Sequence, residues 1–167
     1  MEIKKIVEKL EGTSEFKEWH KENKKSYLAH LYKIVDDATK GIWQIGYYNE
    51  NNTITTFVIE EDDIKIIPEQ EIFQKIKKKV WELDLKDVKL DIAKALDIAK
   101  KFQKKDYPMN EALKIMVVLQ NVADNTIYNI SYMTKSFNTL NMKIDSSDGK
   151  VLSHELIPMM QFTGKGS

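Results

Sequence analysis

The start of the chain follows a helical pattern of apolar positions. Four aliphatic residues recur at the spacing of one helix face: Ile3, Ile6, Val7 and Leu10. Gly12 is well placed to end this helix. Thr13 or Ser14 can cap a second helix, whose apolar side would carry Phe16 and Trp19. The pattern therefore predicts two short consecutive helices.

From residue 27 onward the period changes from helical to strand-like. Runs of alternating or β-branched residues are separated by short polar turns such as DDATKG, NENN and SSDG. These runs predict eight strands in two groups of four: residues 27–35, 42–48, 53–59 and 64–67, then 112–120, 126–134, 138–145 and 150–155. Because turns this short join antiparallel neighbours, each group is expected to form an antiparallel meander.

Two further helices are predicted between the strand groups. Pro68 suits the first position of a helix that would carry Ile72, Phe73 and Ile76. Asp91 can cap the most regular helix of the chain. Its apolar stripe consists of Ile92, Ala95, Leu96, Ala99 and Phe102. Residues 81–90 show the least clear pattern.

A helix followed by four strands thus occurs twice, which indicates an internal repeat. A shift of 85 positions aligns residues 27–48 on residues 112–133 without a gap. The identical pairs in this window are Leu28/Leu113, Ala38/Ala123, Ile42/Ile127, Ile45/Ile130 and Tyr47/Tyr132. The matching order of elements supports the same alignment, so we interpret the chain as a duplicated α+β unit.

The repeat predicts the domain organisation. We expect an α+β protein of two tandem units, each a helix packed on a curved four-stranded antiparallel sheet. The first unit would span residues 1–83 and the second residues 84–162, followed by a disordered tail at residues 163–167. The first strand of each unit is apolar on both faces. Such strands are expected centrally or at the junction, where they would join the units into one compact body.

Charge and composition restrict the classes of function. The chain has 167 residues, with 26 Lys+Arg against 26 Asp+Glu, and every one of these cations is lysine. A neutral chain without arginine lacks long-range attraction to nucleic acid and the bidentate fork that binds phosphates and guanine edges. We therefore expect no nucleic-acid partner. Cysteine is absent, which excludes disulfides, thiolate nucleophiles and iron–sulfur clusters.

Location is predicted from the absence of long apolar runs. The first residues, MEIKKIVEKLEG, are charged and amphipathic and do not resemble a signal peptide. The sequence holds no apolar stretch that approaches the length of a transmembrane helix. As given, the chain is expected to be cytoplasmic and to have no membrane span. A chain from which a leader had been removed would look the same and would be extracytoplasmic.

The second half resembles the PepSY domain family. The residues that carry the resemblance are the helix DIAKALDIAKKF at 91–102 and the hairpin LNMKIDSSDGKVLSHEL at 140–156. Family members end in an alternating strand, then Asp, a short turn closing in Gly-Lys, and Val-Leu. Here these places are occupied by Asp145, Gly149-Lys150 and Val151-Leu152. In the first half the corresponding turn, EEDDIKI, lacks the Gly-Lys, so the resemblance reaches that half only through the internal repeat.

What the resemblance implies is a cystatin-like α+β unit with a non-enzymatic role. PepSY-like domains are associated with binding or inhibition, often of proteases, and usually outside the cytoplasm. The family has no catalytic residues to transfer to this chain. On this basis the two predicted units would be cystatin-like.

Few residues are candidates for catalysis or metal binding. The histidines His20, His30 and His154 show no metal-ligand spacing and are expected to be structural or exposed. The acidic run 60–63 and the pair Asp145 and Asp148 are interpreted as solvated hairpin tips and not as calcium sites. The sequence therefore predicts no catalytic, cofactor-binding or metal-binding residue and no cofactor, and leaves the ligand-binding residues unknown.

Two other sets of residues have alternative interpretations. The alternating aromatic and aliphatic residues of two matching strands form the first set: Trp43, Ile45 and Tyr47, with Tyr128, Ile130 and Tyr132. They could form a stacking platform for single-stranded nucleic acid, but we favour a core that faces the helices. The lysine clusters at residues 75–79 and 100–105 are interpreted as solvated helix faces.

Three hypotheses of function follow. The leading one is a non-enzymatic, inhibitory or regulatory module that binds a protein or peptide through a sheet edge or hairpin tips. The alternative is a small-ligand carrier or an enzyme with a pocket between helix and curved sheet, where His30 or His154 would be the only catalysts. The third is a self-associating module, for which a homodimer through a sheet edge is one arrangement.

Overall fold

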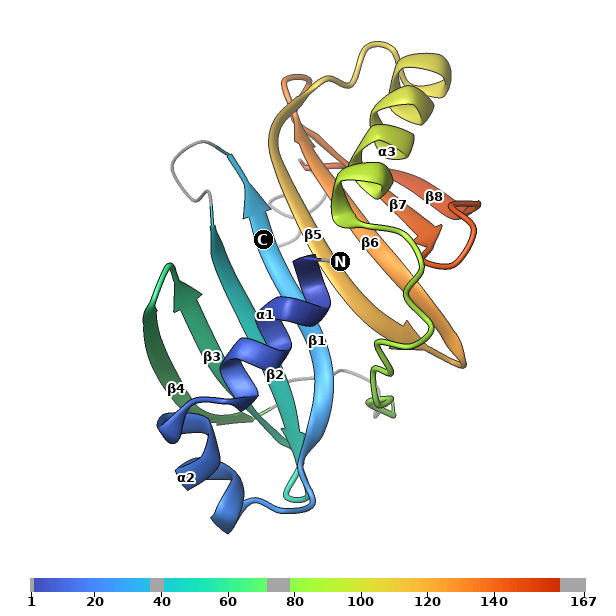
Figure 1. The fold of residues 1–167 in the computed structure, drawn as a ribbon. Coiled ribbons are helices and arrows are strands. Elements are labelled where there is room, and N and C mark those ends of the chain that lie inside the picture. Colours follow the sequence, from blue (N-terminus) through green and yellow to red (C-terminus); the bar gives the residue numbers. More distant parts are fainter. Residues whose placement is uncertain (1, 37–40, 72–78, 160–167) are drawn as a thin grey trace, which may run out of the picture.

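The strands of the chain form one antiparallel sheet. The computed structural model describes residues 2–36, 41–71 and 79–159. Within them lie eight strands in the order β4-β3-β2-β1-β5-β6-β7-β8, which form the continuous twisted sheet in Figure 1. The strands are β1 (Tyr27–Val35), β2 (Ile42–Asn49), β3 (Thr53–Glu60), β4 (Asp63–Glu71), β5 (Ala112–Val122), β6 (Asn125–Thr134), β7 (Asn138–Asp145) and β8 (Val151–Pro158).

The prediction of two tandem units, each with its own four-stranded sheet, is wrong. β1 pairs antiparallel with β5, from His30 opposite Gln120 to Val35 opposite Ile115, and this pairing joins the strands of both halves. Strands that are apolar on both faces are stabilised in the middle of a sheet, where both edges are paired and less surface meets water. The central position expected for these two strands is thus confirmed. The duplication itself, and a boundary after residue 83, stay predictions.

Three helices in the described residues cover one face of the sheet (Figure 1). They are α1 (Glu2–Glu11), α2 (Ser14–Glu22) and α3 (Ile92–Asp106), and all three were predicted. α1 ends at Gly12, whose N–H donates to the Glu8 carbonyl at 3.0 Å. Thr13 is the N-cap of α2, because its Oγ1 accepts a hydrogen bond from the Phe16 N–H.

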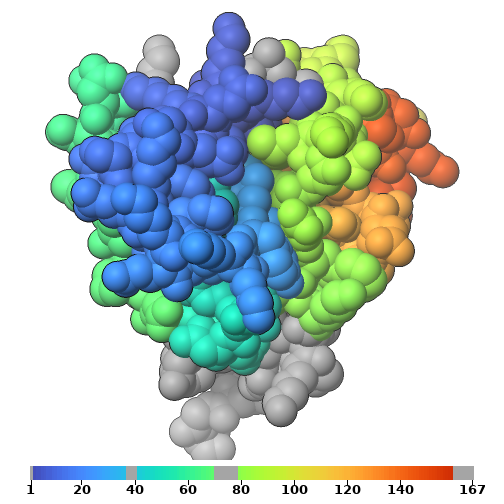
Figure 2. All heavy atoms as spheres, turned by 60° about the horizontal axis from the view of Figure 1, so that its bottom comes forward, coloured from blue at the N-terminus to red at the C-terminus, as the bar shows by residue number. Residues whose placement is uncertain are grey.

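The core lies between this face and the helices. The two aromatic strands contribute Trp43, Ile45 and Tyr47, and Tyr128, Ile130 and Tyr132, each at most 3% exposed. They belong to one apolar cluster with the buried faces of α1, α2 and α3. In Figure 2, α1 and α2 (blue) lie beside the green and yellow-green atoms of residues 79–106. The interpretation of the aromatic strands as core is confirmed.

Two buried tyrosines connect the sheet to the elements above it. The Tyr47 hydroxyl donates to Glu11 Oε1 at the end of α1 (3.0 Å). The Tyr128 hydroxyl donates to the Leu90 carbonyl just before α3 (2.6 Å). Burial is the main cause that raises the pKa of both phenols, so each stays a neutral hydrogen-bond donor. These two bonds help to set where the helices sit on the sheet.

The helix predicted from Pro68 is wrong over the residues that the structure describes. β4 continues through Pro68 to Glu71 at the edge of the sheet. Proline is tolerated there because an edge strand has no ladder partner on its outer side, and the pairing with β3 is irregular opposite it, between Ile54 and Thr56. The remaining helix positions at 72–78 and the tail at 163–167 lie outside the described residues.

The helices in the described ranges do not meet the requirements for a membrane span. None of them is both long and apolar enough to cross a bilayer. The longest, α3, has Lys94, Lys100, Lys101, Lys104 and Lys105 along its length.

Candidate functional site

The most exposed large apolar side chains among the described residues come from two segments at one end of the sheet, near the end of α3. Met109 is 81% exposed, Leu113 67% and Phe137 70%. The other exposed large apolar residues among those described are Ile66, Val122 and Leu152, at only 41–43%. We call Met109, Leu113 and Phe137 the apolar tip. Exposed apolar side chains that gather in one place are more informative than scattered ones.

Backbone pairing brings the two segments of the apolar tip together. Ala112 is paired with Thr134 between β5 and β6. The N–H of Lys135 donates to the Glu111 carbonyl at 3.0 Å. The register of β5 shifts between Ala112 and Lys114, which places Leu113 in a bulge. The loop after α3 and the β6–β7 turn therefore form one surface.

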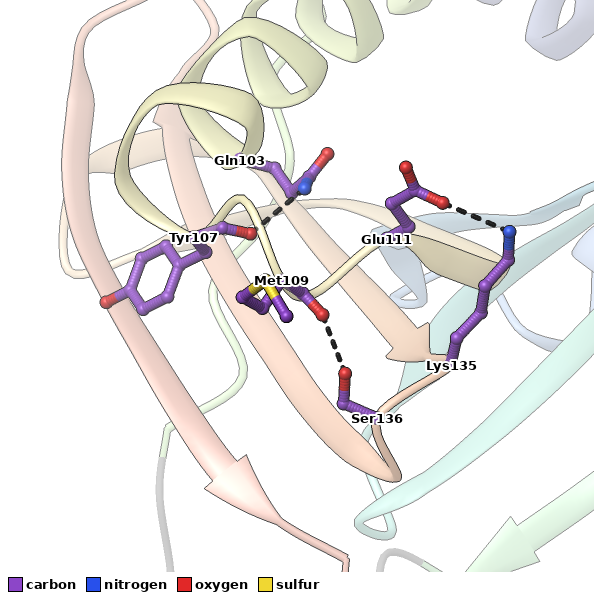
Figure 3. Close-up of polar contacts among 6 residues, drawn as sticks. All are labelled: Gln103, Tyr107, Met109, Glu111, Lys135 and Ser136. Carbon is purple, nitrogen blue, oxygen red and sulfur yellow. Dashed lines mark hydrogen bonds and ion pairs between the residues drawn. The ribbon is translucent and has the colours of Figure 1, made fainter.

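Side-chain hydrogen bonds lie within and between these two segments, as Figure 3 shows. Ser136 Oγ donates to the Met109 carbonyl at 2.6 Å. Gln103, buried near the end of α3, donates through Nε2 to the Tyr107 carbonyl at 3.0 Å. Each bond is expected to contribute about 1 kcal/mol, and together they fix the loop that carries Met109.

The ion pair beside the tip leaves it without net charge. Lys135 Nζ lies 3.0 Å from Glu111 Oε2, and both side chains are more than half exposed (59% and 67%). An exposed pair of this kind contributes roughly 0 to 1 kcal/mol to stability. Its main consequence is that opposite charges flank the apolar tip.

Phe137 occupies an unusual backbone conformation. Its N–H donates to the Thr134 carbonyl at 3.1 Å and closes the β6–β7 turn. The residue has φ +58°, in the left-handed region. For a residue with a Cβ this conformation costs about 1–2 kcal/mol. A strained aromatic residue that remains largely exposed is a reason to look for a function at that position.

The β2–β3 turn has the same backbone geometry but carries asparagine, a common residue for this conformation, at the corresponding position. There the Asn52 N–H donates to the Asn49 carbonyl at 3.1 Å, and Asn52 has φ +59°. Asparagine tolerates this conformation because its short polar side chain can bond locally. The two turns thus share a backbone conformation but differ in the residue at the strained position. Glu61 (φ +53°) and Ala123 (φ +50°) adopt the same region in two other hairpin turns, so the conformation itself belongs to turn formation. What distinguishes Phe137 is a large apolar ring that stays exposed at such a position.

The three histidines lie in three different environments. His20 stacks on Phe16 with ring centroids 5.5 Å apart. His154 packs 4.9 Å from Phe102 and its Nδ1 is hydrogen-bonded to the Tyr107 hydroxyl. His30 lies on β1, where burial lowers its pKa. In the described residues no three His, Asp or Glu side chains are grouped as metal ligands.

His30 is packed on a glycine of the neighbouring strand. Gly46 lies opposite His30 in the β1–β2 register. A Cβ added at Gly46 would come within 2.3 Å of His30 Cε1, so any side chain there would require the imidazole to move. Gly46 therefore gives the imidazole a flat surface on which to pack.

The stability of the protein is expected to fall as the pH is lowered from about 7 to about 5. Burial lowers the pKa of His30 in the folded chain, so in this range the unfolded chain takes up a proton at this residue that the folded chain does not. Urea unfolding midpoints measured across this range test the expectation. A His30→Phe variant should lose part of the pH dependence, and an unchanged dependence would contradict the assignment to His30.

Carboxylates of the acidic turns accept hydrogen bonds from other groups of the chain. Lys9 Nζ donates to Asp62 Oδ1 at 2.7 Å and to the Glu61 carbonyl at 2.8 Å, which ties α1 to the β3–β4 turn. Asp145 Oδ1 accepts from the Ser147 N–H at 2.7 Å, and Asp148 Oδ1 accepts from the Lys150 N–H at 2.9 Å. These contacts fit the interpretation of both segments as hairpin tips.

The sheet edges and the space beneath the helices were the predicted binding places. The edges are β4, which contains Pro68, and β8, on which Leu152 is 43% exposed. A cavity of about 540 Å³ lies between α1, α2 and the start of β1, with Glu11 and His20 in its wall. Binding at an edge, a homodimer through an edge and a ligand under the helices all stay predictions.

Sequence reasoning did not single out the apolar tip. Leu113 entered only as part of an apolar strand, and Met109 and Phe137 were given no role. One local signal was present, because Phe137 stands in the turn TKSFN, where glycine or asparagine is usual. Its exposure depends on how the loop after α3 meets this turn, which no local pattern reveals.

Comparison with known proteins shows a shared fold. No protein-family model matches the sequence, and no curated protein matches it. Among solved structures, the chain is similar to the crystal structure of a "putative lipoprotein" from Clostridium difficile 630, with a TM-score of 0.56 and 20% identity. The match covers 85% of this chain and 90% of that chain. At this identity the similarity shows the fold alone, and membership of the PepSY family stays a prediction.

Proposed function

We propose that this chain is a non-enzymatic binding module that holds a protein or peptide partner against its apolar tip. The observation that carries the proposal is Phe137, an aromatic residue 70% exposed at φ +58°. Selection for stability alone would favour glycine or asparagine at this position and a polar surface around it. A partner that covers the ring would account both for phenylalanine at this position and for the apolar surface around it.

The composition of the tip suits a binding anchor. Aromatic residues and methionine are enriched at protein interfaces, where a few well-packed side chains provide most of the binding energy. Phe137 and Met109 are of these types, and Leu113 extends the apolar area between their segments. The charges of Lys135 and Glu111 beside them resemble the polar rim of an interface.

The rigid frame of the tip also favours binding. Side chains and loops that must be ordered on association reduce affinity. Here the turn is closed by the Phe137 N–H, and the Ser136 hydroxyl fixes the Met109 carbonyl before any partner arrives. Asn138 Nδ2 further donates to Asn110 Oδ1 at 3.0 Å, a third contact between the two segments.

A peptide-display selection on the folded chain tests the proposal. Peptides with apolar anchors are expected to be enriched, and to lose at least tenfold in affinity for the triple variant Met109→Ser, Leu113→Ser and Phe137→Ser, since tenfold corresponds to only about 1.4 kcal/mol. The matched control replaces the other exposed apolar residues: Ile66→Ser, Val122→Ser and Leu152→Ser.

The control variant separates the tip from general surface stickiness. It removes the same number of exposed apolar side chains and should retain the affinity of the wild type. Circular dichroism should show that both variants remain folded, because all six positions are exposed. Equal binding by the wild type and the tip variant would overturn the proposal, as would a loss confined to the control variant.

A further inference from the structure

A second hollow lies on the face of the sheet opposite the helices, where β1 meets β5. Leu31 and Leu119 belong to the core under the helices, so the alternation along each strand directs His30 and Gln120 to the other face. Residues from β1, β3, the β5–β6 hairpin, β7 and segment 79–81 enclose a volume of about 610 Å³. We call this hollow the seam cavity. Its volume is in the range of small-molecule sites.

Segment 79–81 forms one wall of the seam cavity and is anchored to the sheet. The Tyr27 hydroxyl donates to the Val80 carbonyl at 2.6 Å. Two residues further on, Asn121 Nδ2 donates to the Glu82 carbonyl at 3.0 Å, and the Leu83 N–H donates to the Leu28 carbonyl at 2.8 Å. These bonds come from β1 and β5 and fix the wall relative to both strands.

The described residues in the wall of the seam cavity include cationic side chains but no acidic ones. Among the described residues that line it, Lys79 and Lys143 are cationic and none is acidic. The whole chain, by contrast, has as many acids as bases. Lys143 is partly buried on β7, and Lys79 Nζ lies 4.0 Å from the centre of the Trp81 ring. The cavity is thus a local positive site in a neutral protein.

The rest of the wall is apolar with a few polar groups. Ile54, Val80 and Trp81 offer hydrophobic and aromatic surface, while His30 and Asn121 offer hydrogen-bonding groups. Burial lowers the pKa of His30. Asn121 Oδ1 is buried and accepts no hydrogen bond from the described residues. An apolar cavity with a small number of converging polar groups is typical of ligand sites.

From this wall we infer that the seam cavity binds a small organic anion, a carboxylate or sulfonate carried on an aromatic or aliphatic body. Lys79 and Lys143 would pair with the anionic group. Trp81, Val80 and Ile54 would pack against the body of the ligand. This site lies on the opposite face from the helices and is independent of the apolar tip, so either proposal can fail without the other.

The test compares an anionic dye with its neutral analogue on the full chain. The probes are 8-anilino-1-naphthalenesulfonate and N-phenyl-1-naphthylamine, which share the aromatic body and differ in the sulfonate. By titration followed with fluorescence, we expect the sulfonate to bind about tenfold more tightly, as a single favourable ion pair allows. Its affinity should fall about threefold in each of Lys143→Gln and Lys79→Gln, and about tenfold in the double variant, which removes both cations. Lys114→Gln, a lysine of β5 outside the cavity wall, serves as the matched control and should leave the affinity unchanged.

Two further measurements determine where on the protein the sulfonate dye binds. The imidazole NMR signals of His30 should shift on addition of the sulfonate. The single variant Phe137→Ala, which changes only the apolar tip, should bind the probe as the wild type does. Equal affinity for the charged and neutral dyes would overturn the inference. Unchanged affinity in both lysine variants, or His30 signals that do not move, would overturn it as well.

Discussion

Replacing Phe137 by glycine is expected to raise the free energy of unfolding by about 1 kcal/mol. Phe137 has φ +58°, a conformation that glycine adopts without a steric penalty. The ring is 70% exposed, so its removal costs little packing. Gains of this kind are reduced by the larger conformational entropy of glycine in the unfolded chain. Equilibrium urea unfolding of the two proteins measures the difference.

Alanine at the same position separates the backbone from the ring. Phe137→Ala removes the aromatic ring but keeps the Cβ that makes φ +58° unfavourable. It should therefore leave the stability within about 0.5 kcal/mol of the wild type, as is usual for an exposed position. If glycine proves no more stabilising than alanine, the backbone at residue 137 is not strained.

Replacing Gly46 by alanine is expected to lower the free energy of unfolding by about 1–3 kcal/mol, the usual cost of overpacking. The new Cβ would lie 2.3 Å from His30 Cε1 and 2.6 Å from Nε2, so the imidazole has to move. His30 sits at the centre of the sheet, between its partners on β2 and β5. The cost comes from displacing the ring from this position.

A double-mutant cycle identifies the ring as the cause. In a His30→Ala background the clash is absent, and Gly46→Ala should cost less than about 0.5 kcal/mol or even stabilise the strand. Urea unfolding of the four proteins gives the coupling energy. Equal costs in both backgrounds would show that Gly46 is required by the backbone and not by His30.

The sequence predicted local structure well because its patterns are local. The strand 27–35 and the helix after Asp91 follow from period-2 alternation and a 3.6-residue stripe, and both are present. Asp91 is at the N-cap position, but its side chain makes no capping hydrogen bond. The pairing of β1 with β5 brings together residues that are far apart in the sequence, such as His30 and Gln120. Alternation predicts which face of a strand is buried, but it does not predict which other strand pairs with it. Two separate sheets were therefore also compatible with the pattern.

Pro68 shows how tertiary context overrides a local signal. Proline is favoured at the first position of a helix and equally tolerated on the free side of an edge strand. Which role applies depends on whether the segment with the proline can pair with another strand, and here it pairs with β3 from Asp63 to Glu71 and forms the edge strand β4. The sequence around the proline does not carry that information.

The candidate sites were the least predictable part of the molecule. His30 was recognised as a candidate, but the seam cavity beside it also needs the β5–β6 hairpin and segment 79–81, at the start of the residues with the least clear pattern, 81–90. The apolar tip depends on a turn conformation and on the contact of Ser136 with the loop after α3. Both sites arise where segments distant in the sequence meet.

We propose that Phe137 serves binding at a cost in stability. The measurement that tests it most directly is the affinity of Phe137→Gly for a peptide selected on the wild type, determined by isothermal titration calorimetry beside the unfolding experiment. We expect a variant that is more stable by about 1 kcal/mol and binds at least tenfold more weakly, a loss of about 1.4 kcal/mol. A variant that is more stable and binds the peptide as tightly as the wild type would contradict it.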